Sequence, residues 1–118
     1  MCPTGLVPVQ PQVGPQALEA ADAIAVDEAQ FFDDLLEFCT HAADHLHKRV
    51  VVAGLNGCFR RRNFGQLHHV IPLADRITKL SARCFKCQAE ASFSLRLTAE
   101  EEPELVGGAE AYRPVCRK

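Results

Sequence analysis

Three features of the sequence predict an α/β fold built on a parallel sheet. Residues 23–26 and 50–55 are short, uninterrupted apolar runs, the pattern of strands that are covered on both faces. Between them, apolar residues recur at helical spacing from Leu35 to Leu46. The order strand, helix, strand defines a βαβ unit, in which the two strands lie parallel and the crossover is right-handed.

The other elements of this region follow from local signals. Prolines at positions 3, 8, 11 and 15 fix the backbone and remove hydrogen-bond donors, so residues 1–21 are predicted to be a disordered leader that ends in a short helix. Asp33 and Asp34 are suited to cap the main helix, which should run to about Lys48. We expect a loop at 56–65, a helical turn at 67–70 that ends before Pro72, and a further strand at 76–80.

The pattern changes after residue 80, where we expect a domain boundary. Residues 91–97 alternate between apolar and polar side chains, as an antiparallel strand with one solvated face does. Residues 100–104 are an acidic loop, and Gly107-Gly108 marks a tight turn. The sequence therefore predicts three regions: a leader at 1–21, a partial α/β core at 22–80 and a smaller β-domain at 81–118.

Composition argues against several classes of function. The 118 residues carry a net charge of −2, which gives no electrostatic basis for binding nucleic acid or an anionic membrane. No apolar run is long enough to span a bilayer, and the first residues lack the basic and apolar pattern of a secretory signal. Six cysteines without such a signal, two of them in CxxC spacing, indicate reduced thiols, a metal site and a cytoplasmic location.

Two carboxylates follow the first predicted strand. Ligands of open α/β sheets bind at the carboxyl ends of the strands, so Asp27 and Glu28 stand where a phosphate-bound Mg²⁺ and a general base are found. The alternative is a polar turn that leads into a helix. No glycine of the chain precedes a lysine, so these 118 residues contain no phosphate-binding loop of the Walker type.

The cysteines near the end of the chain have the spacing of zinc ligands. Cys84 and Cys87 form one CxxC knuckle, and Cys116 is a candidate third ligand. A fourth ligand is not evident, although His68 or His69 are conceivable, and the alternative is a set of free thiols. His41 and His45, four residues apart on the helix, are more typical of a solvated face than of a metal site.

Several segments together resemble one family. The chain closely resembles the C-terminal half of the cytosolic, zinc-containing (type II) thymidine kinases, and the resemblance extends from about residue 22 to the end. The segments that carry it occur in order at suitable spacing: Asp27-Glu-Ala-Gln-Phe-Phe32, Gly57-Cys-Phe-Arg-Arg-Arg-Asn-Phe-Gly65, Ile71-Pro-Leu-Ala-Asp75, Cys84-Phe-Lys-Cys87 and Val106-Gly-Gly-Ala-Glu-Ala-Tyr112.

The resemblance implies a role for each candidate site residue. Glu28 would be the catalytic base for the thymidine 5′-hydroxyl, and the Mg-ATP region would include Asp27, Glu28, Ala29 and Gln30. The thymidine pocket would be lined by Phe31, Leu55, Phe59 and Phe64, with Ser94 near the thymine methyl group and Tyr112 packed on the base. A lasso-like loop would bind the thymine edge through its backbone, at Pro103, Glu104, Leu105, Val106 and Gly107. The zinc ligands would be Cys84, Cys87 and Cys116. The alternative for the aromatic residues is ordinary packing in the core. We interpret Arg60, Arg61 and Arg62 as a solvated loop, or as a contact to phosphates or a neighbouring subunit.

The resemblance also implies a fold and a set of ligands. It implies a partial P-loop-kinase-like parallel sheet that lacks the phosphate-loop unit, followed by a small, truncated zinc and lasso β-domain. The implied ligands are ATP with Mg²⁺, thymidine and a structural zinc ion whose site is incomplete in this chain. The implied partner is a further copy of the chain, since the family forms homo-oligomers, namely tetramers. We expect the isolated chain to be inactive, and the alternative function is that of a non-catalytic protein that binds thymidine or modulates an oligomer.

Overall fold

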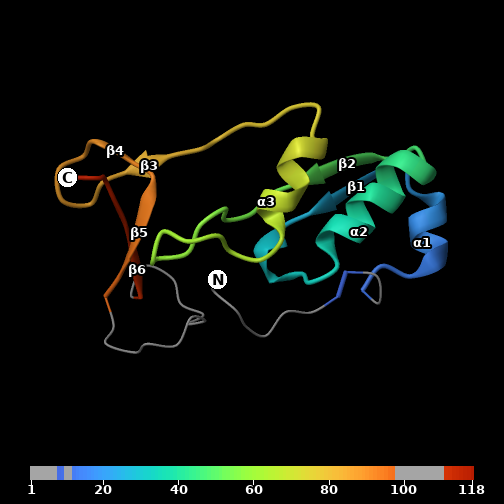
Figure 1. Ribbon diagram of the computed structural model, residues 1–118, viewed down its shortest axis with the longest axis horizontal. Helices are drawn as coiled ribbons and strands as arrows, with labels where there is room; N and C mark the ends of the chain where they lie inside the picture. The colour runs from blue at the N-terminus through green and yellow to red at the C-terminus, as the bar shows by residue number, and fades with distance from the viewer. Residues whose placement is uncertain (1–7, 10–11, 98–110) are drawn as a thin grey trace.

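The computed structural model describes residues 8–9, 12–97 and 111–118. Figure 1 shows an α/β part, with α1, β1, α2, β2 and α3, joined by an extended connection to a group of short strands near the C-terminus. This mixed α/β architecture with a small parallel sheet agrees with the predicted fold class. The proposed division at residues 21/22 and 80/81 stays a prediction.

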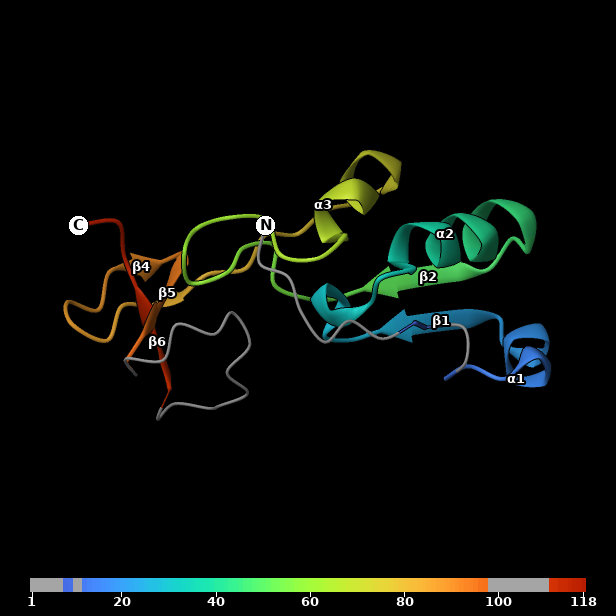
Figure 2. The ribbon, with the colours of Figure 1, turned by 60° about the horizontal axis from the view of Figure 1, so that its bottom comes forward.

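The parallel pair at the centre of the α/β part confirms the predicted βαβ unit. Strand β1 (Ala23–Val26) pairs in parallel with β2 (Arg49–Val52), with Ala23 opposite Arg49 and Val26 opposite Val52. Helix α2 (Leu35–Thr40) connects them and continues as a π-helical turn, η2 (His41–His45). Both views show α2 lying along the strand pair, while the short helix α1 (Pro15–Ala20) stands at its far end (Figure 2).

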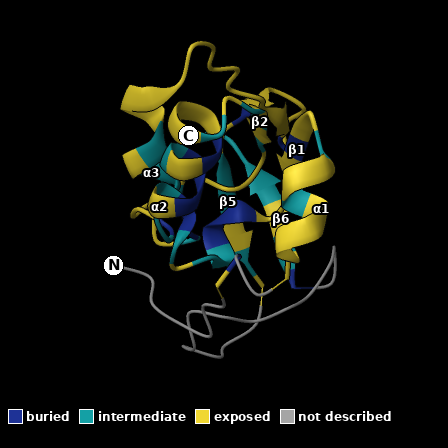
Figure 3. Ribbon diagram, turned by 90° about the vertical axis from the view of Figure 1, so that its right-hand side faces the viewer, coloured by how far each residue is buried: buried dark blue, intermediate teal, exposed yellow. Residues whose placement is uncertain are grey.

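The core lies between α2 and one face of the sheet. Leu35, Phe38 and Ala42 are at most 1% exposed and pack against Ile24 and Val26 of β1. Their spacing of three and four residues places them on one side of the helix, which is why the helical periodicity predicted the core. Helix α1 contributes no buried residue, and Figure 3 shows its turns mostly exposed.

The main helix begins where it was predicted to, but its capping differs. Asp34 occupies the N-cap position without a side-chain capping bond. Its Oδ1 instead accepts the backbone N–H of Val9 at 2.6 Å, and Val9 is buried in the same core. A carboxylate at this position can serve either partner, and here it ties the segment before α1 to the helix.

The described residues of this chain cover one face of the sheet and leave the other face exposed. Ile24 and Val26 of β1 are buried, whereas Ala23 and Ala25, which point to the opposite face, are exposed. On the same face Val51 of β2 is 56% exposed. The sequence predicted strands covered on both faces, and within the described chain this is wrong because no element packs on the second face.

The segment between the two parts also departs from the expectation. Helix α3 (Leu67–Val70) forms as predicted and continues as a 3₁₀ turn, η3 (Ile71–Leu73), through Pro72. The strand predicted at 76–80 is absent, and Ile77 and Leu80 are 58% and 83% exposed. A strand needs a pairing partner, and no described strand lies alongside this segment.

The C-terminal part consists of two antiparallel pairs. Strand β3 (Ala82–Arg83) pairs with β4 (Glu90–Ala91), and β5 (Phe93–Arg96) pairs with β6 (Tyr112–Val115). The alternation at 91–97 therefore correctly predicted an antiparallel strand. In the described ranges, no helix has the length and apolar character needed to cross a membrane.

Candidate functional site at the carboxyl ends of the parallel strands

The two carboxylates stand at the tip of β1, as the sequence predicted. Glu28 adopts the left-handed backbone conformation (φ 50°, ψ 41°), and Asp27 Oδ1 accepts the Glu28 N–H at 2.8 Å. The chain then enters a 3₁₀ turn, η1 (Ala29–Phe31), whose first N–H binds the Ala53 carbonyl at the end of β2. A left-handed non-glycine residue costs about 1 kcal/mol or more, and such residues occur at turns and cluster at functional sites.

Gln30 connects this tip to the exit of β2. Its side chain is 1% exposed, Oε1 accepts the Leu55 N–H at 2.9 Å, and Nε2 donates to Glu28 Oε2 at 2.5 Å. The structure therefore brings together Asp27, Glu28, Gln30 and Leu55, four of the residues that the sequence singled out. The Leu55 side chain itself is 51% exposed.

The predicted aromatic residues form two separate contacts. Phe31 and Phe64 meet edge to face, with ring centroids 5.5 Å apart, and Phe64 is buried with Cys58. Phe59 lies against the guanidinium of Arg96, which is 4.0 Å from the ring centroid. Arg96 also donates to the Tyr112 hydroxyl at 2.6 Å and lies 5.3 Å from that ring. Arg96 thus links Phe59 of the 57–65 loop to Tyr112 of β6.

Arg96 is a site residue that sequence reasoning missed. Pairing of β5 with β6 places Arg96 directly opposite Tyr112. The sequence signal for this contact was the alternation of β5, which predicted an antiparallel strand. Ser94, which the sequence did single out, is half-buried in the same strand and lies opposite Pro114. The guanidinium groups of Arg61 and Arg117 lie 3.9 and 4.8 Å from the centroid of the Phe93 ring, and that of Arg60 lies 5.3 Å from the Phe59 ring, so two members of the arginine run contact rings within the chain.

Tight backbone hydrogen bonds give the 57–65 loop its shape. Gly57 and Asn63 form an isolated bridge, Cys58 N–H binds the Arg62 carbonyl at 2.9 Å, and Arg61 is left-handed (φ 59°). This turn sends Phe64 towards Phe31 and leaves Phe59 to the C-terminal strands.

The predicted zinc ligands lie together. The sulfur atoms of Cys84, Cys87 and Cys116 are all within 4.8 Å of one another, and those of Cys87 and Cys116 are 3.6 Å apart. The turn after β3 supplies the first two, and the residue after β6 supplies the third. No histidine belongs to this cluster among the described residues; His68 and His69 instead lie against each other, with ring centroids 4.0 Å apart.

The surroundings of the three thiols suit a metal. Hydrogen bonds from the backbone amides of Cys116, Cys87 and Lys86 lower the pKa of the buried Cys84 thiol to about 6, so the thiolate that binds metals prevails at neutral pH. The backbone amide of Ala89 acts to lower the pKa of the Cys87 thiol. The hydrogen bonds of that thiol to the thiols of Cys116 and Cys84 act in the opposite direction, and the pKa of Cys87 is raised overall. By contrast, burial and then the Asp34 charge raise the pKa of Cys39 to about 11, as for a core thiol.

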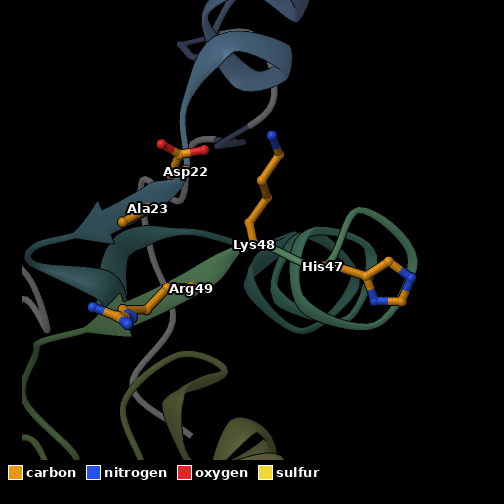
Figure 4. Close-up of a pocket in the computed structure, with 5 residues that line it drawn as sticks. All are labelled: Asp22, Ala23, His47, Lys48 and Arg49. Carbon is orange, nitrogen blue, oxygen red and sulfur yellow. The ribbon is translucent and has the colours of Figure 1, made fainter.

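A large hollow elsewhere on the α/β part is not this site. It has a volume of about 560 Å³ and is lined at the amino ends of β1 and β2 by Asp22, Ala23, His47, Lys48 and Arg49. Figure 4 shows that the Lys48, His47 and Arg49 side chains point away from one another. Lys48 Nζ donates to the Glu19 carbonyl at 2.9 Å. The hollow therefore lacks convergent groups and lies at the opposite strand ends from Glu28.

The predicted base-binding loop cannot be compared with this geometry. Its five candidate residues lie outside the described residues: Pro103, Glu104, Leu105, Val106 and Gly107.

Comparison with known proteins decides the family. The family model described as thymidine kinase matches residues 11–118, which is most of the chain. The chain belongs to the type II thymidine kinase family. It is 53% identical over 109 residues to a thymidine kinase of Oryza sativa subsp. japonica, and 51% identical over 105 residues to thymidine kinase a of Arabidopsis thaliana. It is also 47% identical over 102 residues to the cytosolic thymidine kinase of Gallus gallus.

These alignments cover most of this chain and less than half of each relative. They include 92%, 89% and 86% of this chain, and 40%, 44% and 45% of the rice, Arabidopsis and chicken proteins. The chain therefore spans somewhat under half the length of these relatives.

Proposed function

We propose that this chain supplies the base and the nucleoside pocket for transfer of the ATP γ-phosphoryl group to the 5′-hydroxyl of thymidine. The observation that carries the proposal is the Glu28 carboxylate at the tip of β1, held by Gln30 beside the exit of β2. Parallel α/β sheets bind ligands at this end of their strands. Family membership is consistent with thymidine and ATP as the substrates.

In the proposed reaction, Glu28 accepts the proton of the attacking hydroxyl. The O–H bond breaks as the hydroxyl oxygen bonds to the γ-phosphorus, and ADP leaves with the electron pair of the broken P–O bond. Asp27, whose carboxylate is exposed beside Glu28, would face the Mg-ATP region, where Mg²⁺ supplies charge neutralisation when bound. Since the 118 residues contain no Walker-type loop, they do not by themselves fit the nucleotide phosphates.

The aromatic residues suit the proposed nucleoside site. Phe31 and Phe64 offer edge-to-face apolar surface next to η1, and Phe59 and Tyr112 offer rings that Arg96 holds in place. Flat apolar surface with a few fixed polar groups is what a pyrimidine base requires. Leu55, Ser94 and the residues 103–107 complete the pocket in this proposal.

We also propose that the cysteine cluster binds a structural zinc ion. Three sulfur atoms within 4.8 Å, one of them on a thiol with a depressed pKa, match the soft ligands that zinc prefers. The ion would join the β3–β4 turn to the end of β6, and water or a further ligand would complete its shell. A cytosolic location and a homo-oligomer belong to the same proposal, supported by relatives from chicken and hamster that are named cytosolic thymidine kinases.

The proposed function is tested in a fusion protein. In the fusion, the segment of the rice thymidine kinase that precedes the matched region is joined to the N-terminus of residues 11–118. We expect the fusion to convert thymidine to its monophosphate with ATP, whereas the 118-residue chain assayed alone gives no product because its sequence contains no Walker-type phosphate-binding loop. Product is measured by liquid chromatography and mass spectrometry, with the rice segment alone as the control. A well-folded, inactive fusion that still binds radiolabelled thymidine would favour the non-catalytic alternative instead.

A further inference from the structure

The Gln30 amide has a single orientation that satisfies both of its neighbours. A backbone N–H only donates and a carboxylate only accepts, so the oxygen must face Leu55 and the nitrogen must face Glu28. The distances of 2.9 and 2.5 Å fit this assignment. The carboxylate position is therefore tied to the backbone at the exit of β2 through one side chain.

The surroundings of Gln30 are built to hold this side chain in place. At 1% exposure the amide is screened from water, so leaving either end unpaired would cost free energy. A Cβ atom at Gly54 would come within 2.6 Å of Gln30 Oε1. At Gly65, where φ is +60°, a Cβ would overlap the Gln30 carbonyl oxygen. Two separate backbone segments thus approach Gln30 closely. A side chain at Gly65 would collide with the Gln30 backbone, and a side chain at Gly54 would displace the Gln30 amide.

Glu28 itself is exposed and would otherwise have the rotamer freedom of a long side chain. We propose that Gln30 is a positioning residue, which fixes the Glu28 carboxylate relative to the exit of β2 and the 57–65 loop. The inference rests on the proposed role of Glu28 as the base, and assigns Gln30 to Glu28 rather than to direct contact with the cofactor. The buried amide, already bonded at both ends, leaves little of Gln30 to present to a nucleotide.

Two substitutions at Gln30 separate positioning from packing. Gln30→Glu keeps the shape and the acceptor for Leu55 N–H, but replaces the donor to Glu28 with a second negative charge. Gln30→Met keeps the volume and removes both hydrogen bonds. The matched control is Gln66, whose Oε1 accepts the Leu36 N–H at 3.0 Å and whose Nε2 donates to the Asp33 carbonyl, away from Glu28.

In the fusion, we expect Gln30→Glu to lower kcat by about 10–100-fold with KM for thymidine changed less than about threefold, since misplacing a catalytic group acts on the transition state. The acidic limb of its pH–kcat profile should also move to higher pH, because two adjacent carboxylates hold a proton more firmly than one. Asp27 adjoins Glu28 in both proteins, so its charge cancels in the comparison. Gln66→Glu should leave kcat and the profile within about twofold of the parent, because the Gln66 side chain bonds to Leu36 and Asp33 and neither bond reaches Glu28.

A second readout does not depend on turnover. Side-chain relaxation of Glu28, measured by NMR in the selectively labelled fusion, should show increased motion in Gln30→Met and no change in Gln66→Met. Equal Glu28 motion in the parent fusion, Gln30→Met and Gln66→Met would overturn the positioning role. A kcat loss in Gln30→Glu without a change in the pH profile would overturn it as well. An inactive parent fusion would contradict the proposed function, and the relaxation data would still decide the role of Gln30.

Discussion

Replacing Glu28 with glutamine should lower kcat of the fusion by about 10²–10⁴-fold, the range that a positioned general base contributes. The substitution is nearly isosteric, and the oxygen of the introduced amide can still accept from Gln30 Nε2, so the geometry of the β1 tip is retained. What is lost is the ability to take the hydroxyl proton. KM for thymidine should therefore change little, because the group acts in the transition state.

The control for this result is Glu37→Gln, which removes a negative charge from the exposed face of α2. It should keep kcat within about twofold of the parent. Steady-state rates are measured at saturating ATP with thymidine varied. If Glu28→Gln retained more than a tenth of the parental kcat, Glu28 would not be the base and the β1 tip would need another role.

Replacing Cys84 with serine should abolish stable zinc binding and disorder the turn between β3 and β4. Structural zinc sites contribute about 10–16 kcal/mol in total, so losing one of three thiolates should weaken binding by at least about 100-fold. Cys84 is the most sensitive choice because it is the buried member of the cluster and its thiol has the depressed pKa. The α/β core should persist, since none of its members comes from residues 82–97 or 111–118.

Zinc content after gel filtration and amide NMR spectra together check this expectation. Resonances of residues 82–97 should lose dispersion in Cys84→Ser, while those of β1 and β2 keep theirs. Cys39→Ala is the matched control, because Cys39 is a buried thiol of the other core and should leave the zinc content at the parental value. Full zinc occupancy in Cys84→Ser would show that the three-cysteine site is wrong.

The parts of the fold that sequence predicted well are those where one periodicity dominates. The apolar run of β1, the helical spacing of Leu35, Phe38 and Ala42, and the alternation of β5 each led to the observed element. The prediction of a strand at 76–80 failed because a strand also requires a partner, and local sequence does not reveal whether one is present. The same reason explains the exposed second face of the sheet.

The sequence predicted the positions of the candidate residues better than the contacts between them. Asp27 and Glu28 follow a strand, and Cys84 and Cys87 share a short motif, so their positions could be inferred locally. The bond from Gln30 to Leu55 and the contact of Arg96 with Phe59 join residues far apart in the chain. Such contacts depend on how the 57–65 loop folds back, which local sequence does not determine.

The most direct test of the central claim is an intermolecular NOE experiment on the fusion with bound thymidine. The account predicts contacts from the C5-methyl group and the ribose protons of thymidine to the ring protons of Phe59, Phe64 or Tyr112. NOEs from thymidine to residues 22–23 and 47–49, at the opposite strand ends, with none to these three rings, would contradict it.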